Sequence, residues 1–209
     1  MDSVLKELKA RYPELGACES QIEQAGEEWI SCFRSGGKLL LCGNGGSAAD
    51  AEHIVGELMK GFQKRRPLPE DARRRLESLY PGERLAEGLQ GALPAIALGA
   101  HTALGTAYSN DVSADMVFAQ QVWGYGKPGD ALLALSTSGN SRNVVNAVKV
   151  ARAAGVRTVG IGGGTGGALK SLCDVYVLLP ESETYLVQEL TLPVYHALCR
   201  IAEEYFWSE

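Results

Sequence analysis

Residues 38–47, with the sequence KLLLCGNGGS, decide the fold because they join a buried strand to a helix through a glycine turn. Residues 38–42 form a short apolar run of the kind found in parallel strands that are buried on both faces. The glycine turn follows, and residues 48–62 then carry a helical pattern. The stretch therefore predicts a strand–turn–helix unit, from which α/β sheets are built.

The rest of the chain repeats this alternation. Residues 1–35 predict a helical N-terminal segment with a break near Pro13 and Gly16. Apolar runs predict further strands at 94–98, 130–135, 158–161 and 175–179, and helical patterns predict helices at 113–125, 143–154 and 183–205. We expect an α/β fold, a three-layer sandwich whose five-stranded, mostly parallel sheet carries helices on both faces. No linker or repeat divides the chain, so a single domain over residues 1–209 is expected.

Residues 63–91 interrupt the alternation. Two basic runs, at 64–66 and 73–75, lie among prolines and acidic residues, and a short helix is expected around residues 71–79. The segment is either a solvated surface insertion or a basic arm that attracts an anionic substrate.

Composition limits the classes of function. The chain of 209 residues is 45% hydrophobic and 22% charged, with a formal net charge of −5, which is typical of a soluble globular protein. This charge gives no basic footprint, so nucleic acid is not an expected partner. No stretch resembles a signal peptide or a membrane span, so no membrane partner is expected either. The five cysteines are scattered and lack a C-x-x-C pair, which favours reduced thiols and a cytoplasmic location.

Two loops at the expected carboxyl ends of strands are suited to a phosphate. Residues 43–47 form a glycine-rich loop before a helix start, where free backbone N–H groups could bind a phosphate. The alternative is an ordinary tight turn with an N-cap. Residues 136–141, with the sequence STSGNS, bring three serine hydroxyls and one threonine hydroxyl to another helix start. Neither loop is a Walker A or G-x-G-x-x-G motif, so nucleotide binding has no support. The glycine-rich residues 162–167 are expected to form a plain turn.

Two of the three histidines are each separated by a helical spacing from a residue whose side-chain oxygen could bind a metal. His53 and Glu57 are four residues apart, and Gln188 and His196 are eight apart, so each pair roughly shares a helix face. If the two helices meet, two imidazoles, one carboxylate and one amide could hold a divalent metal such as zinc, or supply an acid and a base. Taken singly, each residue also has an ordinary structural or solvated explanation.

Asp50 and His101 lie outside this set. Asp50 lies one turn before His53, where it would either orient the His53 ring or place negative charge near a helix N-terminus. His101 has no partner motif and is expected to be structural or to lie at the rim of a site.

Together these stretches resemble the sugar isomerase (SIS) domain and, within it, the phosphoheptose isomerase family. The resemblance rests on residues 42–47, the His53-x-x-x-Glu57 spacing, residues 136–141, and the Gln188–His196 pair, and it covers nearly the whole chain. It implies an aldose–ketose isomerase, an intramolecular oxidoreductase. The reaction implied is the conversion of sedoheptulose 7-phosphate to D-glycero-D-manno-heptose 7-phosphate through an enediol or enediolate.

The resemblance also implies roles for individual residues. One Zn²⁺ ion per subunit, or another divalent metal, would be held by His53, Glu57, Gln188 and His196. Glu57 and His196 would also be the catalytic acid–base pair. The substrate would contact Asn44, Gly45, Gly46, Ser47, Glu57, Asn110, Asp111, Ser136, Thr137, Ser138, Ser141 and Gln188. The family resemblance implies a homotetramer with active sites at subunit interfaces.

Two other interpretations stay open. Some SIS chains bind a sugar phosphate without converting it and act as regulators, and one relative is a tetrameric scaffold that assists a replication initiator. The chain could also be an isomerase of another sugar phosphate, with residues 64–91 reshaping the pocket. The presence of all four residues of the metal set favours an enzyme.

Overall fold

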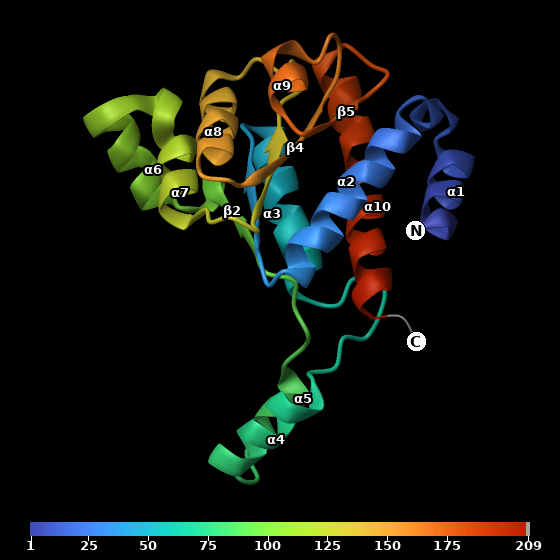
Figure 1. The fold of residues 1–209 in the computed structure, drawn as a ribbon, viewed down its shortest axis with the longest axis vertical. Helices are drawn as coiled ribbons and strands as arrows, with labels where there is room; N and C mark the ends of the chain where they lie inside the picture. Colours follow the sequence, from blue (N-terminus) through green and yellow to red (C-terminus); the bar gives the residue numbers. More distant parts are fainter. Residues whose placement is uncertain (208–209) are drawn as a thin grey trace.

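The computed structural model describes residues 1–207. Within them, five strands form one sheet in which every neighbouring pair is parallel, in the order β2-β1-β3-β4-β5 (Figure 1). The strands are β1 (Leu39–Cys42), β2 (Ala95–Ala97), β3 (Ala131–Leu135), β4 (Arg157–Gly162) and β5 (Val175–Leu178). The prediction of a five-stranded α/β sheet is confirmed, and the sheet is wholly parallel.

The strand β1 shows why the sheet is covered on both faces. Its four residues are all buried, and their side chains alternate between two cores. Leu39 and Leu41 belong to the core that also contains residues of α1 (Asp2–Arg11), α2 (Glu19–Arg34), α3 (Gly46–Met59) and α10 (Thr184–Phe206). Leu40 and Cys42 belong to the opposite core, which contains residues of α7 (Val117–Tyr125), α8 (Arg142–Ala153) and α9 (Gly167–Leu172). The result is the expected three-layer sandwich.

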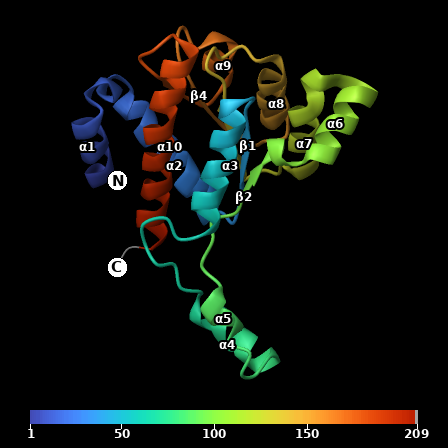
Figure 2. The ribbon, with the colours of Figure 1, turned by 180° about the vertical axis from the view of Figure 1, so that it is seen from behind.

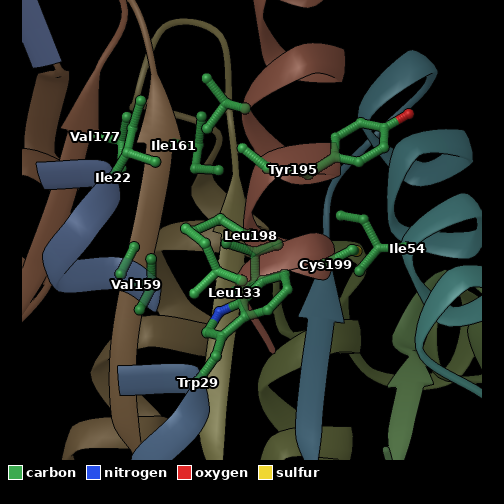
Figure 3. Packing of buried hydrophobic residues seen from close by; sticks show 14 of the residues in the cluster. Ile22, Trp29, Ile54, Leu133, Val159, Ile161, Val177, Tyr195, Leu198 and Cys199 are labelled. Carbon is green, nitrogen blue, oxygen red and sulfur yellow. The ribbon is translucent and has the colours of Figure 1, made fainter. Parts of the chain in front are cut away.

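The larger core joins α3 and α10 to the sheet. Trp29 from α2 is fully buried beside Leu133 and Leu198, while Ile54 from α3 lies near Cys199 from α10 (Figure 3). Burying one aliphatic side chain of this size contributes about 1.5–3 kcal/mol to folding. The two helices that carry the histidine motifs are therefore fixed side by side by core packing.

Most helices agree with the sequence prediction, and four details differ. The expected helix at 113–125 becomes regular only at Val117, after a π-helical segment at Ser109–Ser113 and a 3₁₀ turn at Ala114–Met116. Three short helices were not predicted: α5 (Leu85–Gly88), α6 (Thr102–Tyr108) and α9. Their lengths and glycine or alanine content leave little periodic apolar pattern.

The cysteines are mostly residues of the core. All five cysteines are free, and four of them are buried. Burial raises the pKa of the Cys18 thiol to about 11, as expected for an unreactive core cysteine. Within residues 1–207, no helix combines the length and the apolarity needed to span a membrane.

Between α3 and β2 the chain leaves the sandwich and forms a projecting arm, residues 67–90. It consists mainly of α4 (Glu70–Leu79) and α5, which extend away from the sheet in both views (Figures 1 and 2). Neither helix has a buried residue, and several large apolar side chains of the arm are exposed, namely Leu79, Tyr80, Leu85 and Leu89. The arm confirms the expected helix at 71–79.

Arg66 anchors the base of the projecting arm. Its side chain is fully buried, its Nε donates to Glu203 Oε1 at 2.8 Å, and its guanidinium lies over the Trp207 ring. Its remaining nitrogens donate to the carbonyls of Leu58 and Glu57, at the C-terminal end of α3. Glu203 also accepts hydrogen bonds from the backbone N–H groups of Phe62, Gln63 and Lys64. One buried ion pair thus joins the ends of α3 and α10.

These hydrogen bonds control the charge of Glu203. Burial alone would raise the pKa of its carboxyl group, but the N–H groups of Phe62 and Gln63 and the Arg66 guanidinium outweigh it. The pKa of Glu203 therefore lies below its usual value of 4.5. The carboxylate is ionised at neutral pH, and its charge is balanced by Arg66.

We expect Arg66→Ala to lower the free energy of unfolding by about 3–5 kcal/mol, because the Glu203 carboxylate would be left buried and unpaired. Urea unfolding followed by circular dichroism measures this loss. Arg74→Ala is the matched control, since the ion pair of Arg74 with Glu70 lies on the exposed surface of α4 and should contribute almost nothing. Equal losses in the two variants would contradict this role of Arg66.

Candidate functional site

The first predicted loop is a tight turn between β1 and α3. Gly45 has a φ of +55°, which a residue with a Cβ rarely adopts, and α3 begins at Gly46. The Asn44 carbonyl accepts from the Ser47 N–H, and the Ser47 side chain is buried. The turn therefore presents Asn44 and Gly45 at a helix N-terminus, where the helix dipole favours an anion.

The second predicted loop follows β3 and holds its hydroxyl groups close together. Ser136 Oγ and Ser141 Oγ are hydrogen-bonded at 3.0 Å, and Ser138 Oγ accepts from the Asn140 N–H at 3.2 Å. The Thr137 carbonyl accepts from Gly163 N–H, so the loop is also fixed to the turn after β4. A Cβ at Gly139 would overlap the Gly166 carbonyl, which explains the glycine at this crossing.

The two loops are joined directly by a pair of amide side chains. Asn44 and Asn143 exchange two hydrogen bonds, each 2.9 Å long. Asn143 is a functional candidate that sequence reasoning missed. Its signal in the sequence was its place in the first turn of the helix that follows residues 136–141.

A cleft of about 740 Å³ opens beside the first loop, and Asn110 contributes to its wall together with Asn44, Gly45 and Asn143. The Asn110 amide donates to Asp111 Oδ1 at 2.9 Å, but Asp111 is not among the residues that line the cleft. The residues that line the cleft do not include His53, Glu57 or His196. Within one chain, the cleft and the histidine cluster are therefore separate.

Three of the four predicted metal ligands lie together between α3 and α10. His53 Nε2 is 3.3 Å from Glu57 Oε1, and the centroids of the His53 and His196 rings are 5.1 Å apart. The Glu57 side chain is only 13% exposed, whereas that of His53 is 44% exposed. The helical spacing of His53 and Glu57, together with the contact between α3 and α10, thus places these three side chains in one cluster.

Gln188 is placed differently from the other three. Its amide lies against the start of α3, where a Cβ on Gly46 would be 2.5 Å from Gln188 Nε2. His53 follows Gly46 by seven residues, about 10 Å along a helix. The Gln188 amide therefore adjoins the first loop, two turns from the histidine cluster.

The cluster has donors of the right kind for a divalent metal, but they do not converge on one point. In the described part of the chain, no three His, Cys, Asp or Glu side chains are placed to hold a metal ion together. His196 Nε2, however, is buried without a hydrogen-bond partner. Leaving such an atom unpaired costs about 1–3 kcal/mol, which a ligand at that nitrogen would recover. The donor set therefore fits a divalent metal after side-chain adjustment.

Electrostatics at the cluster favour a neutral His196. Burial lowers the pKa of His196 below its usual 6.5, and the nearby His53 lowers it further, while the Glu57 carboxylate acts in the opposite direction. A neutral imidazole keeps a lone pair that can accept a proton or bind a metal. On the other side of the carboxylate, Lys60 Nζ is 2.8 Å from Glu57 Oε2, and it would have to turn away for a cation to bind that oxygen.

Tyr195 is a second residue that sequence reasoning missed. Its hydroxyl is 2.9 Å from His53 Nδ1, and it is also hydrogen-bonded to Asp50. Burial raises the pKa of Asp50, while the hydrogen bond from Tyr195 and the proximity of His53 lower it in part. Asp50 therefore reaches His53 through Tyr195. His101 packs against Tyr125, with ring centroids 5.7 Å apart, away from this cluster.

Comparison with known proteins identifies the class. The family model described as SIS domain matches residues 5–78 and 83–163, in agreement with the parallel sheet and the hydroxyl-rich loop. A phosphoheptose isomerase from Rhodospirillum rubrum is 38% identical over 190 residues, which are 91% of this chain and 88% of the relative. The chain belongs to the phosphoheptose isomerase family of SIS-domain proteins.

Solved structures agree with this assignment. A phosphoheptose isomerase from Francisella tularensis superimposes with a TM-score of 0.77 at 30% identity, covering 94% of this chain and 92% of that chain. A phosphoheptose isomerase from Neisseria gonorrhoeae gives a TM-score of 0.70 at 31% identity, covering 94% of this chain and 98% of that chain.

Proposed function

We propose that this protein is an aldose–ketose isomerase that converts sedoheptulose 7-phosphate to D-glycero-D-manno-heptose 7-phosphate. The observation that carries the proposal is the cluster of His53, Glu57 and His196, which α3 and α10 bring together in a chain of the phosphoheptose isomerase family. A carboxylate beside a neutral imidazole is a suitable arrangement for moving a proton between neighbouring carbons.

The two loops bind the substrate in this proposal. The phosphate is held by hydroxyl and N–H groups of the second loop, with help from the first, through Ser136, Thr137, Ser138, Ser141 and Ser47. Asn44, Gly45 and Gly46 line the sugar, Asn110 contacts it from the cleft wall, and Asp111 contacts it from beside Asn110. The hydrogen bond between Ser136 and Ser141, and the pairing of Asn44 with Asn143, support this assignment because they preorganise both loops.

Glu57 is the base that removes the proton from the carbon next to the carbonyl, which gives an enediolate; protonation of its oxygen gives the enediol. His196 is neutral at rest, so it must first take up a proton; as the imidazolium it donates that proton to the oxygen or to the facing carbon, and its lowered pKa favours giving the proton up. Proton transfer by positioned groups contributes about 10²–10⁴-fold to the rate. The phosphate contacts orient the reacting end of the sugar, so binding energy is used for catalysis.

We further propose one divalent metal, Zn²⁺ or another ion, per subunit, held by His53, Glu57, Gln188 and His196. When bound, such an ion acts as a Lewis acid toward the substrate carbonyl. Glu57 can be both ligand and base because its oxygens differ: Oε1 faces His53, whereas Oε2 faces Lys60. The buried, unpaired Nε2 of His196 supports the site, and the Gln188 side chain must move to complete it.

We also propose a homotetramer whose active sites lie at subunit interfaces. Two observations support this. The cleft beside Asn44 and the histidine cluster are separate within one chain, and the His53 side chain is open to a neighbouring molecule. A second subunit would therefore be able to close the site around a single substrate.

A panel of ketose phosphates with five to seven carbons tests the proposed reaction. Aldose formation is measured with the metal-loaded protein, and the highest kcat/KM is expected with sedoheptulose 7-phosphate. Preference for another ketose would keep the isomerase and replace the substrate. Binding of sugar phosphates without any turnover would instead support a non-catalytic regulator or scaffold.

We expect Glu57→Gln to lower kcat by about 10²–10⁴-fold, because the amide cannot accept the proton from carbon. Steady-state kinetics measure the loss, and circular dichroism should show an unchanged fold. Glu52→Gln on the exposed part of α3 is the matched control and should retain full activity. Wild-type turnover by Glu57→Gln would refute the assignment of the base.

Combined Ser138→Ala and Ser141→Ala substitutions should raise KM for the sugar phosphate by about 10²–10⁴-fold, since hydrogen bonds to a charged group contribute about 1.5–3 kcal/mol each and about 1.4 kcal/mol is tenfold. The change in kcat should be smaller, because Glu57 and His196 are unchanged. Ser171→Ala, on the exposed surface of α9, serves as control. An unchanged KM in the double variant would place the phosphate elsewhere.

A further inference from the structure

Tyr195 lies behind His53 and takes no part in the chemistry described above. It is 1% exposed, and its hydroxyl is 2.9 Å from His53 Nδ1. Figure 3 shows its ring extending from α10 toward α3, with the oxygen at the end nearer α3. The other ring nitrogen, His53 Nε2, is the one that faces Glu57. The two nitrogens of His53 therefore have different surroundings, one with a fixed partner and one at the cluster.

The hydrogen-bonding capacities of the three groups determine where the proton of His53 lies. An ionised carboxylate only accepts hydrogen bonds, and a tyrosine hydroxyl has a single hydrogen to donate. When Tyr195 donates to Asp50, its oxygen can only accept from His53. Nδ1 of His53 then carries the imidazole proton, and Nε2 keeps its lone pair.

The other side of the ring is consistent with this direction. The distance of 3.3 Å from His53 Nε2 to Glu57 Oε1 exceeds the roughly 2.7–2.9 Å expected for a charge-assisted N–H···O bond. Nε2 and Oε1 are instead two electron-pair donors that face the same space. A cation held between Nε2 and Oε1 would use both of these lone pairs.

We propose that Asp50 and Tyr195 are positioning residues that hold His53 as the Nδ1–H tautomer and direct Nε2 toward a divalent cation. This inference rests on the metal site of the proposed function, and it assigns that site an orienting chain from both helices. Asp50 comes from α3 and Tyr195 from α10, so the orientation of His53 also depends on the contact between these helices. Such partners typically change metal affinity by about 10–100-fold.

Calorimetric titration of the metal-free protein with Zn²⁺ tests the proposal. Asp50→Ala and Tyr195→Phe are each expected to weaken Zn²⁺ binding by about 10–100-fold. In Asp50→Ala the Tyr195 hydroxyl is free to donate to Nδ1, which moves the proton of His53 to Nε2. In the double variant the loss of Zn²⁺ affinity should not exceed the larger of the two losses in the single variants, because both residues act through one chain of hydrogen bonds. Tyr205→Phe, on the exposed end of α10, is the control.

The tautomer itself provides a readout that loss of packing would not change. Nitrogen NMR of the zinc-free protein, above the titration range of its histidines, should show His53 protonated at Nδ1 in the wild type and at Nε2 in Asp50→Ala. Unchanged Zn²⁺ affinity, additive losses in the double variant, or an Nε2–H tautomer in the wild type would each overturn the inference. If Tyr195→Phe does not fold, Asp50→Ala and the wild-type spectrum still decide.

His53→Ala separates this inference from the function on which it rests. If His53→Ala abolishes Zn²⁺ binding while Asp50→Ala and Tyr195→Phe bind as the wild type does, only the positioning role fails. If His53→Ala binds Zn²⁺ as tightly as the wild type, the proposed metal site itself is wrong.

Discussion

The packing of α3 against α10 is the contact on which the rest of the site depends. These helices are far apart in the sequence. The helix α3 carries His53 and Glu57, and α10 carries Gln188 and His196. Core residues such as Ile54 and Cys199 fix their separation, while the buried pair of Arg66 and Glu203 fixes their ends. Because Arg66 also donates to the Glu57 carbonyl, this ion pair helps to fix the position of the proposed base.

The order of the strands brings the two loops together, just as the packing of α3 against α10 brings the histidines together. With β1 next to β3, the turns that leave these strands emerge side by side at one edge of the sheet. Asn44 and Asn143 then need only short side chains to connect them. A phosphate-binding surface can therefore be made from glycines, hydroxyls and helix N-termini without a lysine in either loop.

The sequence was informative where structure is local. The apolar run at 38–42, the glycines that follow, and the spacing of His53 and Glu57 depend on neighbouring residues, so strand, turn and shared helix face could all be predicted. The missed features depend on tertiary contacts. Arg66 and Glu203 are 137 residues apart, and Tyr195 reaches His53 across two helices. The placement of Gln188 against Gly46 depends on a side-chain conformation, which spacing cannot specify.

The arm formed by α4 and α5 has a consequence for how this chain can change. Its helices bury no residue, and the family model is interrupted within it, between residues 78 and 83. Since α4 and α5 themselves have no buried residue, the length and composition of this part of the arm are little constrained by the sheet. Substitutions can therefore accumulate in the arm, and a label or a second domain can be inserted there, without altering the sandwich that carries the candidate site.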